Sequence, residues 1–369
     1  MSETPSQLQR DAARNIVTKY LKVRPGENAI IESWDHTIPM ASAMVDAVRR
    51  VGGSALLVHE SEDAWWRAIE RKQSKLLGKS SAPEWAALKA ADVYVNFWGP
   101  GDTDRIEKIP DRPGNEAFAW NWPWYAVARK AGLRGVRMTT AFATEGRAKE
   151  WGVDLAKWEE SMLRASLIDP EETAQRGARL SQAFAGGKKV RITHSNGTDL
   201  EVALAGIPPR LLDGRPHPYG KGDSPSGMLQ QVPSGIVEAA LDSKTAEGSF
   251  RANRRTNIWW NWHAGGTLEF ADGELASYSL EEGEEEFARQ YKKGTAGKNR
   301  TSILKLGLNP AVKDVPNLET VEGGSASLQI GGNRGLGGTN GSNFFSWFSL
   351  AGSEIAIDGT TVIRAGKFL

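Results

Sequence analysis

The first half of the chain alternates between helical and strand-like patterns of apolar residues. Residues 7–21 carry apolar side chains at helical spacing, and a short apolar run follows at residues 29–31. Residues 41–51 repeat the helical pattern, and residues 54–59 and 91–98 form two further strand-like runs. Strands separated by helices are typical of a doubly wound parallel sheet, so we predict an α/β amino-terminal domain.

Polar and aromatic residues directly follow two of these predicted strands. Asp35 and His36 come after the first strand, and Trp98 and Asp102 come after the third. The ligand crevice of a doubly wound sheet lies beyond the carboxyl ends of its strands. We therefore count Asp35 among the candidate catalytic residues, although an exposed acid is more often simply solvated.

The pattern changes at about residue 188. Two short strands are predicted at residues 189–193 and 199–203, joined by a Ser-Asn-Gly turn, and glycine-rich strands and turns fill residues 323–368. Helical spacing returns only near residues 285–291. With 369 residues, the chain exceeds the size at which a single core usually divides. We predict an α/β domain at residues 1–186 and a β-rich catalytic domain of α+β type at residues 187–369.

Composition excludes several classes of protein. The formal net charge is +1, so no large field of one sign attracts nucleic acid or anionic lipid, and we expect neither as a partner. The chain has no cysteine, which excludes disulfides and cysteine-ligated zinc. Its polar start does not have the pattern of a signal peptide, and no apolar stretch is long enough to cross a membrane. A cytoplasmic location is expected.

Several segments resemble landmarks of the aminopeptidase S/T family of metallopeptidases, in the same order along the chain. They are VRPGENAIIES, VRITHSNGTDLEVAL, QVPSGIVEAALDSKTAEGSF, GTLEFADGEL, LGLNP and the final glycine-rich segment. The resemblance covers nearly the whole chain. It implies an α/β amino-terminal domain and a β-rich carboxy-terminal domain that binds divalent metals and mediates assembly, so a homo-oligomer is expected. Relatives of that family include a nitroanthranilate aminohydrolase and iron-dependent dihydroxypyridine dioxygenases.

The family's metal ligands are replaced in this sequence. Matching each ligand motif to the chain gives six positions, occupied by Ile236, Ile303, Ser327, Arg334, Phe345 and Trp347. Isoleucine, phenylalanine and tryptophan offer no lone pair of the kind that a hard or borderline cation requires. We therefore expect no metal ligands, no metal and no cofactor, and a flatter, more apolar pocket suited to a neutral planar ligand.

Without a metal, hydrolysis needs a positioned general base. Glu238 is the first candidate, because it lies two residues after Ile236 and shares its face of a strand. His263 and Asp35 are alternatives, as are His194 and His36, although a lone histidine is more often structural. Arg334 could donate hydrogen bonds to developing negative charge, or it could form a salt bridge with an acid such as Glu238. Lys305 could equally point to solvent.

Aromatic and small polar residues are the candidate walls of the pocket. Most tryptophan clusters serve as core or interface packing, but residues 259–263 (WWNWH) lie in the predicted catalytic half. Asn340 and Asn343 could add donors, although asparagine beside glycine mostly signals a turn. The candidate substrate-binding residues are Ile236, Trp262, Ile303, Ser327, Asn343, Phe345 and Trp347.

Three functions remain open at this stage. The first, which the nitroaromatic branch of the family suggests, is a metal-independent hydrolase in which water displaces nitrite from a small electron-poor ring such as 2-nitroimidazole. Phe345 and Trp347 would then sandwich the ring, and Arg334 would stabilise the charge on the nitro group. The second is a metal-dependent aminopeptidase or aromatic aminohydrolase with ligands elsewhere. The third is a non-catalytic binding protein.

Overall fold

The computed structural model describes residues 4–102, 105–106, 108–119, 121–217, 228–258 and 261–369. The chain forms two compact units, the first made of Met1–Asp169 and Gly214–Pro233 and the second of Pro170–Asp213 and Ser234–Leu369. The expected single boundary at residue 186 differs from this division in two ways, because residues 170–186 belong to the second unit and residues 214–233 return to the first. No helix in the described ranges combines the length and the apolar character needed to span a membrane.

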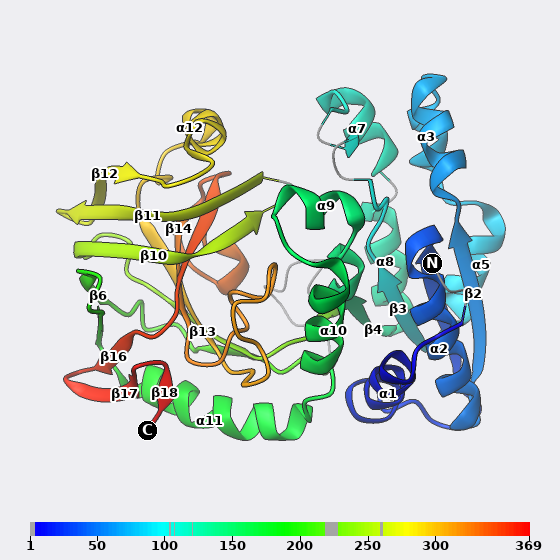
Figure 1. Ribbon diagram of the computed structural model, residues 1–369, viewed down its shortest axis with the longest axis horizontal. Coiled ribbons are helices and arrows are strands. Elements are labelled where there is room, and N and C mark those ends of the chain that lie inside the picture. The colour runs from blue at the N-terminus through cyan, green and yellow to red at the C-terminus, as the bar shows by residue number, and fades with distance from the viewer. Residues whose placement is uncertain (1–3, 103–104, 107, 120, 218–227, 259–260) are drawn as a thin grey trace. The chain divides into compact units, whose positions relative to one another are not determined.

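The first unit is built on a five-stranded parallel sheet (Figure 1). Its strands, in spatial order, are β2 (Ser54–Glu60), β1 (Asn28–Trp34), β3 (Val93–Phe97), β4 (Arg134–Met138) and β8 (Leu229–Val232). The predicted strands at residues 29–31, 54–59 and 91–98 are confirmed as β1, β2 and β3. β4 and β8 complete the sheet, and β8 belongs to the segment that returns to this unit.

Helices cover both faces of the central strand β1, because both of its faces are apolar. Ala29 and Ile31 of β1 pack with α1 (Gln7–Asn15) and α2 (Ile38–Arg50), whereas Ile30 packs with α5 (Ala82–Ala90) and α8 (Asn121–Ala131). Helix α1 begins at a capping box and continues as a π-helix, η1 (Ile16–Tyr20), within the helical pattern predicted for residues 7–21. The unit's other helices are α3 (Glu62–Glu70), α4 (Ser74–Leu77), α7 (Asp111–Ala117), α9 (Glu145–Glu150) and α10 (Leu155–Ala165).

The second unit contains two antiparallel sheets and the helices α11 (Pro170–Gly186) and α12 (Glu284–Lys293). The larger sheet has the order β12 (Glu274–Ser279), β11 (Asn261–Ala271), β10 (Glu247–Ile258), β6 (Asp199–Ala203), β5 (Lys189–Thr193), β16 (Glu354–Ile357), β17 (Thr360–Arg364) and β18 (Lys367–Phe368). The smaller has the order β15 (Phe345–Leu350), β14 (Ala326–Gly331), β13 (Thr301–Gly307), β9 (Ile236–Ala240) and β7 (Arg210–Leu212). The predicted β5–β6 hairpin and the helix near residues 285–291 are confirmed.

The core of the second unit lies between its two sheets. Alternate residues of the smaller sheet, among them Val237, Leu304, Leu328 and Phe348, join Val190, Leu200 and Phe250 of the larger sheet in one apolar cluster. Side chains along a strand alternate between its faces, so the intervening residues of β9, β13, β14 and β15 lie on the opposite face of the smaller sheet. That opposite face, which we call the outer face, carries the candidate site.

Candidate active site

A row of polar side chains crosses the outer face of the smaller sheet. The pairing of the strands aligns Arg210 of β7, Glu238 of β9, Lys305 of β13, Ser327 of β14 and Ser349 of β15. Directly paired residues in antiparallel strands point to the same face. Lys305 is therefore part of the buried row and does not extend freely into solvent, since only 13% of its side chain is exposed.

Five of the six replaced ligand positions lie on this same face. Ile236 lies two residues before Glu238, Ile303 two before Lys305, and Ser327 is directly paired with Lys305. Trp347 pairs with Gln329, two residues after Ser327, and Phe345 lies two residues before Trp347. The sheet thus gathers residues that are spread over more than a hundred positions of the sequence, as a shared site requires.

Arg334 is the sixth position, and it lies outside the sheet. It begins a short 3-10 helix, Arg334–Leu336, whose Leu336 packs against Ala240 and Ile303. The Arg334 side chain is exposed, and no carboxylate of the described ranges lies within salt-bridge distance of it. The salt bridge between Arg334 and Glu238 considered above is therefore not formed.

Glu238 is instead held by two other cations. Its Oε2 accepts hydrogen bonds from Nε and Nη2 of Arg210, at 2.9 and 2.6 Å, and its Oε1 lies 3.7 Å from Nζ of Lys305. Glu238 therefore bridges the two cations and holds them in place.

Glu319, which the sequence patterns did not single out, is the carboxyl group best suited to accept a proton. It lies in the loop between β13 and β14, and its Oε1 accepts a hydrogen bond of 3.1 Å from Nε1 of Trp347. Its Oε2 is buried and has no hydrogen-bond partner among the residues that the structure describes. Burial raises the pKa of Glu319 to about 7, although the Trp347 hydrogen bond and the charge of Lys305 oppose that rise.

Lys305 links the two carboxyl groups and the aromatic wall. Its Nζ lies 4.3 Å from the centre of the Trp347 ring, a cation–π contact. Burial lowers the pKa of Lys305, and the charges of Glu238 and Glu319 oppose this effect. The site therefore combines the Lys305 side chain, the carboxyl group of Glu238 that contacts it, and a second carboxyl group, Glu319, whose pKa is about 7.

The rings of Phe345 and Trp347 are nearly parallel, with an interplanar angle of 13° and centroids 6.1 Å apart. A planar ligand between two rings needs about 7 Å, because each contact between carbon atoms takes about 3.5 Å. The two rings therefore do not form a sandwich in this arrangement. Phe345, at 37% exposure, instead offers a ring face against which a planar ligand could stack.

His263 and Trp262 lie on β11 of the larger sheet. His263 is buried, its Nε2 donates a hydrogen bond of 3.1 Å to the carbonyl oxygen of Trp347, and its ring packs against Phe348 on the core side. Burial lowers its pKa to about 4, so the ring stays neutral at physiological pH. This environment favours a structural role. Trp262 is half-buried, and the guanidinium of Arg255 stacks over its ring at 4.6 Å.

The two asparagines of the glycine-rich segment stabilise turns. Asn343 exchanges hydrogen bonds with the backbone N–H and the hydroxyl of Thr295, and Asn340 donates to the carbonyl oxygen of Gly297. His194 accepts a hydrogen bond from the backbone of Asn196 within the β5–β6 turn. Trp259 and Trp260 lie outside the described residues.

Asp35 and His36 belong to the first unit. Asp35 is exposed, pairs with His59 at 2.9 Å and accepts a hydrogen bond from the backbone N–H of Glu62 at the start of α3. His36 contacts the carbonyl oxygen of Ala141. These contacts are local to the first unit, whereas the polar row and its aromatic wall are built entirely by the second.

The residues at the replaced ligand positions do not fit a divalent metal. Two isoleucines, a phenylalanine and a tryptophan have no donor oxygen or imidazole nitrogen, and the Oγ of Ser327 is hydrogen-bonded to Ser349 at 2.6 Å. Nor does the described part of the chain contain a group of three or more histidine, aspartate or glutamate side chains arranged to hold a metal.

Comparison with known proteins supports the fold. The structure is similar to AmpT from Thermus thermophilus, with a TM-score of 0.72 and 17% identity over 98% of this chain and 99% of that one. It is also similar to 2,5-dihydroxypyridine dioxygenase from Pseudomonas putida KT2440, with a TM-score of 0.61 and 16% identity over 100% of this chain and 98% of that one. Neither protein-family models nor curated protein sequences give a match. The chain thus has an AmpT-like fold, combining a parallel-sheet domain with an antiparallel one.

Proposed function

We propose that the outer face of the smaller sheet is the active site of a metal-independent hydrolase. Its substrate would be a small electron-poor nitroheteroaromatic ring, such as 2-nitroimidazole, from which water displaces nitrite. The observation that carries the proposal is Glu319, a buried carboxyl group with one unpartnered oxygen in the described structure and a pKa of about 7, close to the Lys305 cation and the Trp347 ring. A base of that pKa is well matched to neutral pH.

The chemistry requires a base, a cation and an aromatic surface. The ring would stack on the exposed face of Phe345, beside Trp347. Glu319 takes one proton from water while the water oxygen bonds to the ring carbon that carries the nitro group. The added electron pair moves onto the nitro oxygens, where the ammonium of Lys305 stabilises it. The bond between carbon and nitrogen then breaks, nitrite leaves, and the ring keeps the new hydroxyl, which tautomerises to a carbonyl.

The roles of the other residues follow from their contacts. Glu238 and Arg210 hold Lys305 in place, because Glu238 bridges the two cations. Trp347 fixes Oε1 of Glu319 through its indole N–H, which leaves Oε2 as the oxygen that accepts the proton. Ile236 and Ile303 supply apolar surface and exclude water around the ring. Arg334, exposed at the border of this surface, is not required for charge stabilisation in this scheme.

The proposal is tested by measuring nitrite release from 2-nitroimidazole by protein that has been treated with a chelator and desalted. The rate should rise with pH through about 7, as Glu319 loses its proton. Glu319→Gln should lower the rate by about 100-fold or more, the usual contribution of a general base. In water enriched in oxygen-18, the label should appear in the organic product and not in nitrite.

Glu285→Gln is the matched control, because Glu285 is an exposed acid on α12, away from the polar row. It should leave nitrite release unchanged. If turnover appears only after zinc, manganese or iron is added, the metal-dependent hydrolase becomes the better explanation. If the protein binds 2-nitroimidazole but releases no nitrite under either condition, a binding protein is indicated and the proposal fails.

A further inference from the structure

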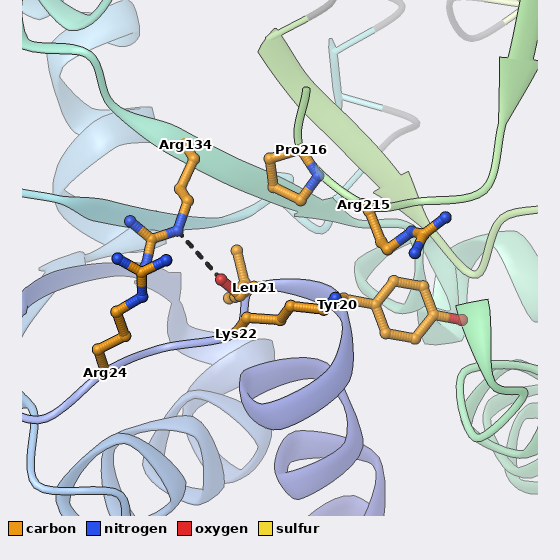
Figure 2. Close-up of a pocket in the computed structure, with 7 residues that line it drawn as sticks. All are labelled: Tyr20, Leu21, Lys22, Arg24, Arg134, Arg215 and Pro216. Carbon is orange, nitrogen blue, oxygen red and sulfur yellow. Dashed lines mark hydrogen bonds between the residues drawn. The ribbon is translucent and has the colours of Figure 1, made fainter. Parts of the chain in front are cut away.

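The first unit contains a cavity lined by basic side chains, which the proposed hydrolysis does not use. It has a volume of about 390 Å³, and its described lining consists of Tyr20, Leu21, Lys22, Arg24, Arg134, Arg215 and Pro216 (Figure 2). These residues come from three separate parts of the sequence: the end of η1 with the turn after it, the start of β4, and the segment that returns to the first unit. Folding of this unit alone brings them together.

Four of these seven residues are cationic, and none is acidic. Like charges that converge on one concave space repel each other, most strongly where the surrounding protein excludes water. The chain as a whole has a net charge of only +1, so this concentration of positive charge is local and does not reflect a generally basic protein. An anion held in the cavity would offset the repulsion.

Part of the lining is held in place by interactions with other residues of the first unit. Nε of Arg134 donates a hydrogen bond of 3.0 Å to the carbonyl oxygen of Leu21, as Figure 2 shows, and its Nη2 forms an ion pair with Glu27. The hydroxyl of Tyr20 donates to the carbonyl oxygen of Ile168 at 2.9 Å, which fixes the ring that forms one wall. A site whose walls are already ordered loses less entropy when it binds a ligand.

We propose that this cavity binds a small soluble molecule that carries a phosphate ester or a pyrophosphate group. Guanidinium groups present paired donors that match phosphate oxygens, and three of them line the cavity together with the point charge of Lys22, although Arg134 already bonds to Leu21 and Glu27. Its volume falls within the range typical of small-molecule sites and exceeds what a lone ion needs. Binding of a nucleic acid or a membrane surface requires a broad basic face, whereas the basic residues described here line one cavity.

Calorimetric titration of the full chain with pyrophosphate tests the proposal, with sodium chloride added to hold the ionic strength constant. The wild-type protein should show saturable binding. The double variant Lys22→Asn, Arg24→Gln removes two charges from exposed positions and leaves Arg134 and its contacts intact. Asparagine suits residue 22 because Lys22 has a positive φ of 49°. Loss of two charge-assisted contacts should weaken binding by at least about tenfold.

The matched control is Lys292→Gln, Lys293→Gln, which removes the same charge from two exposed residues at the end of α12. It should bind pyrophosphate as the wild type does. Equal weakening in the two double variants would show a general charge effect and overturn the proposal, as would the absence of saturable binding. Binding to vesicles of anionic lipid without binding to pyrophosphate would also overturn it, because the site would then serve a membrane. Nitrite release plays no part in this test, so the two proposals can fail separately.

Discussion

Replacing Glu319 by glutamine should make the protein more stable at neutral pH and should change how stability depends on pH. In the folded protein the pKa of this carboxyl is raised from 4.5 to about 7, mainly by burial. Ionising the group in the folded state therefore costs free energy that the unfolded chain does not lose. Glutamine keeps the shape of the side chain and its hydrogen bond with Trp347, but it carries no charge at any pH.

The sign and size of the change in unfolding free energy follow from proton linkage. Below pH 4.5 both states carry the proton, and the stability contributed by the protonated carboxyl is fully present. Between pH 4.5 and about 7 the unfolded chain binds fewer protons than the folded one, so stability falls as the pH rises. The difference of about 2.5 between the two pKa values corresponds to about 3 kcal/mol. The Glu319→Gln variant should gain about that much relative to the wild type between pH 4.5 and pH 8.

Urea unfolding at a series of pH values, followed by tryptophan fluorescence, measures this difference. Subtracting the wild-type curve from the variant curve cancels the titration of groups that do not interact with Glu319, His263 included. Glu285→Gln, at an exposed position, should give a flat difference curve. If the curve for Glu319→Gln is also flat within about 0.5 kcal/mol, burial does not raise the pKa of Glu319. The proposed mechanism then has no general base.

Two further predictions concern the core side of the site and the polar row. His263, with its pKa lowered to about 4 from 6.5, should destabilise the folded protein as the pH falls between those values, by about 3 kcal/mol in total. Acid unfolding of His263→Phe should lack that contribution, and an unchanged acid dependence would contradict the buried position of the ring. Ser327→Ala leaves the buried hydroxyl of Ser349 unpaired and should cost about 1–3 kcal/mol. Urea unfolding of the Ser327→Ala, Ser349→Ala double variant should show a loss smaller than the sum of the two single losses, and simple additivity would argue against the hydroxyl pair.

Local patterns in the sequence predict the elements that are made of continuous apolar runs. β1, β2 and β3 were predictable for this reason, whereas the β5–β6 hairpin was predictable from two short strands joined by a Ser-Asn-Gly turn. β4 reads RGVRM and β8 reads LQQV, so neither is a long apolar run, and their pairing joins residues that are distant in the sequence. Such strands form because they pair with the edge of an existing sheet, and the local periodicity of the sequence does not reveal that pairing.

The candidate site was predictable where it depends on strand alternation and unpredictable where it depends on a loop. Ile236 and Glu238 share a face because they are two residues apart on a strand. Only 13% of the Lys305 side chain is exposed although Lys305 lies on the outer face of β13, and alternation alone does not indicate that. Glu319 is one of 45 acidic residues and lies in an irregular loop, so only the fold shows that it is buried against Trp347.

Because residues Gly214–Pro233 return to the first unit, its sheet can be completed only late in synthesis. β4 ends at Met138, but its outer neighbour β8 ends only at Val232, after α11, β5, β6 and β7 have been made. At about 5–20 residues per second, the nascent sheet would wait roughly 5–20 s on the ribosome with the edge of β4 unpaired. An unpaired parallel strand edge is a template for aggregation. Correct folding of this protein during synthesis should therefore require that the edge of β4 is protected from other chains until β8 is made.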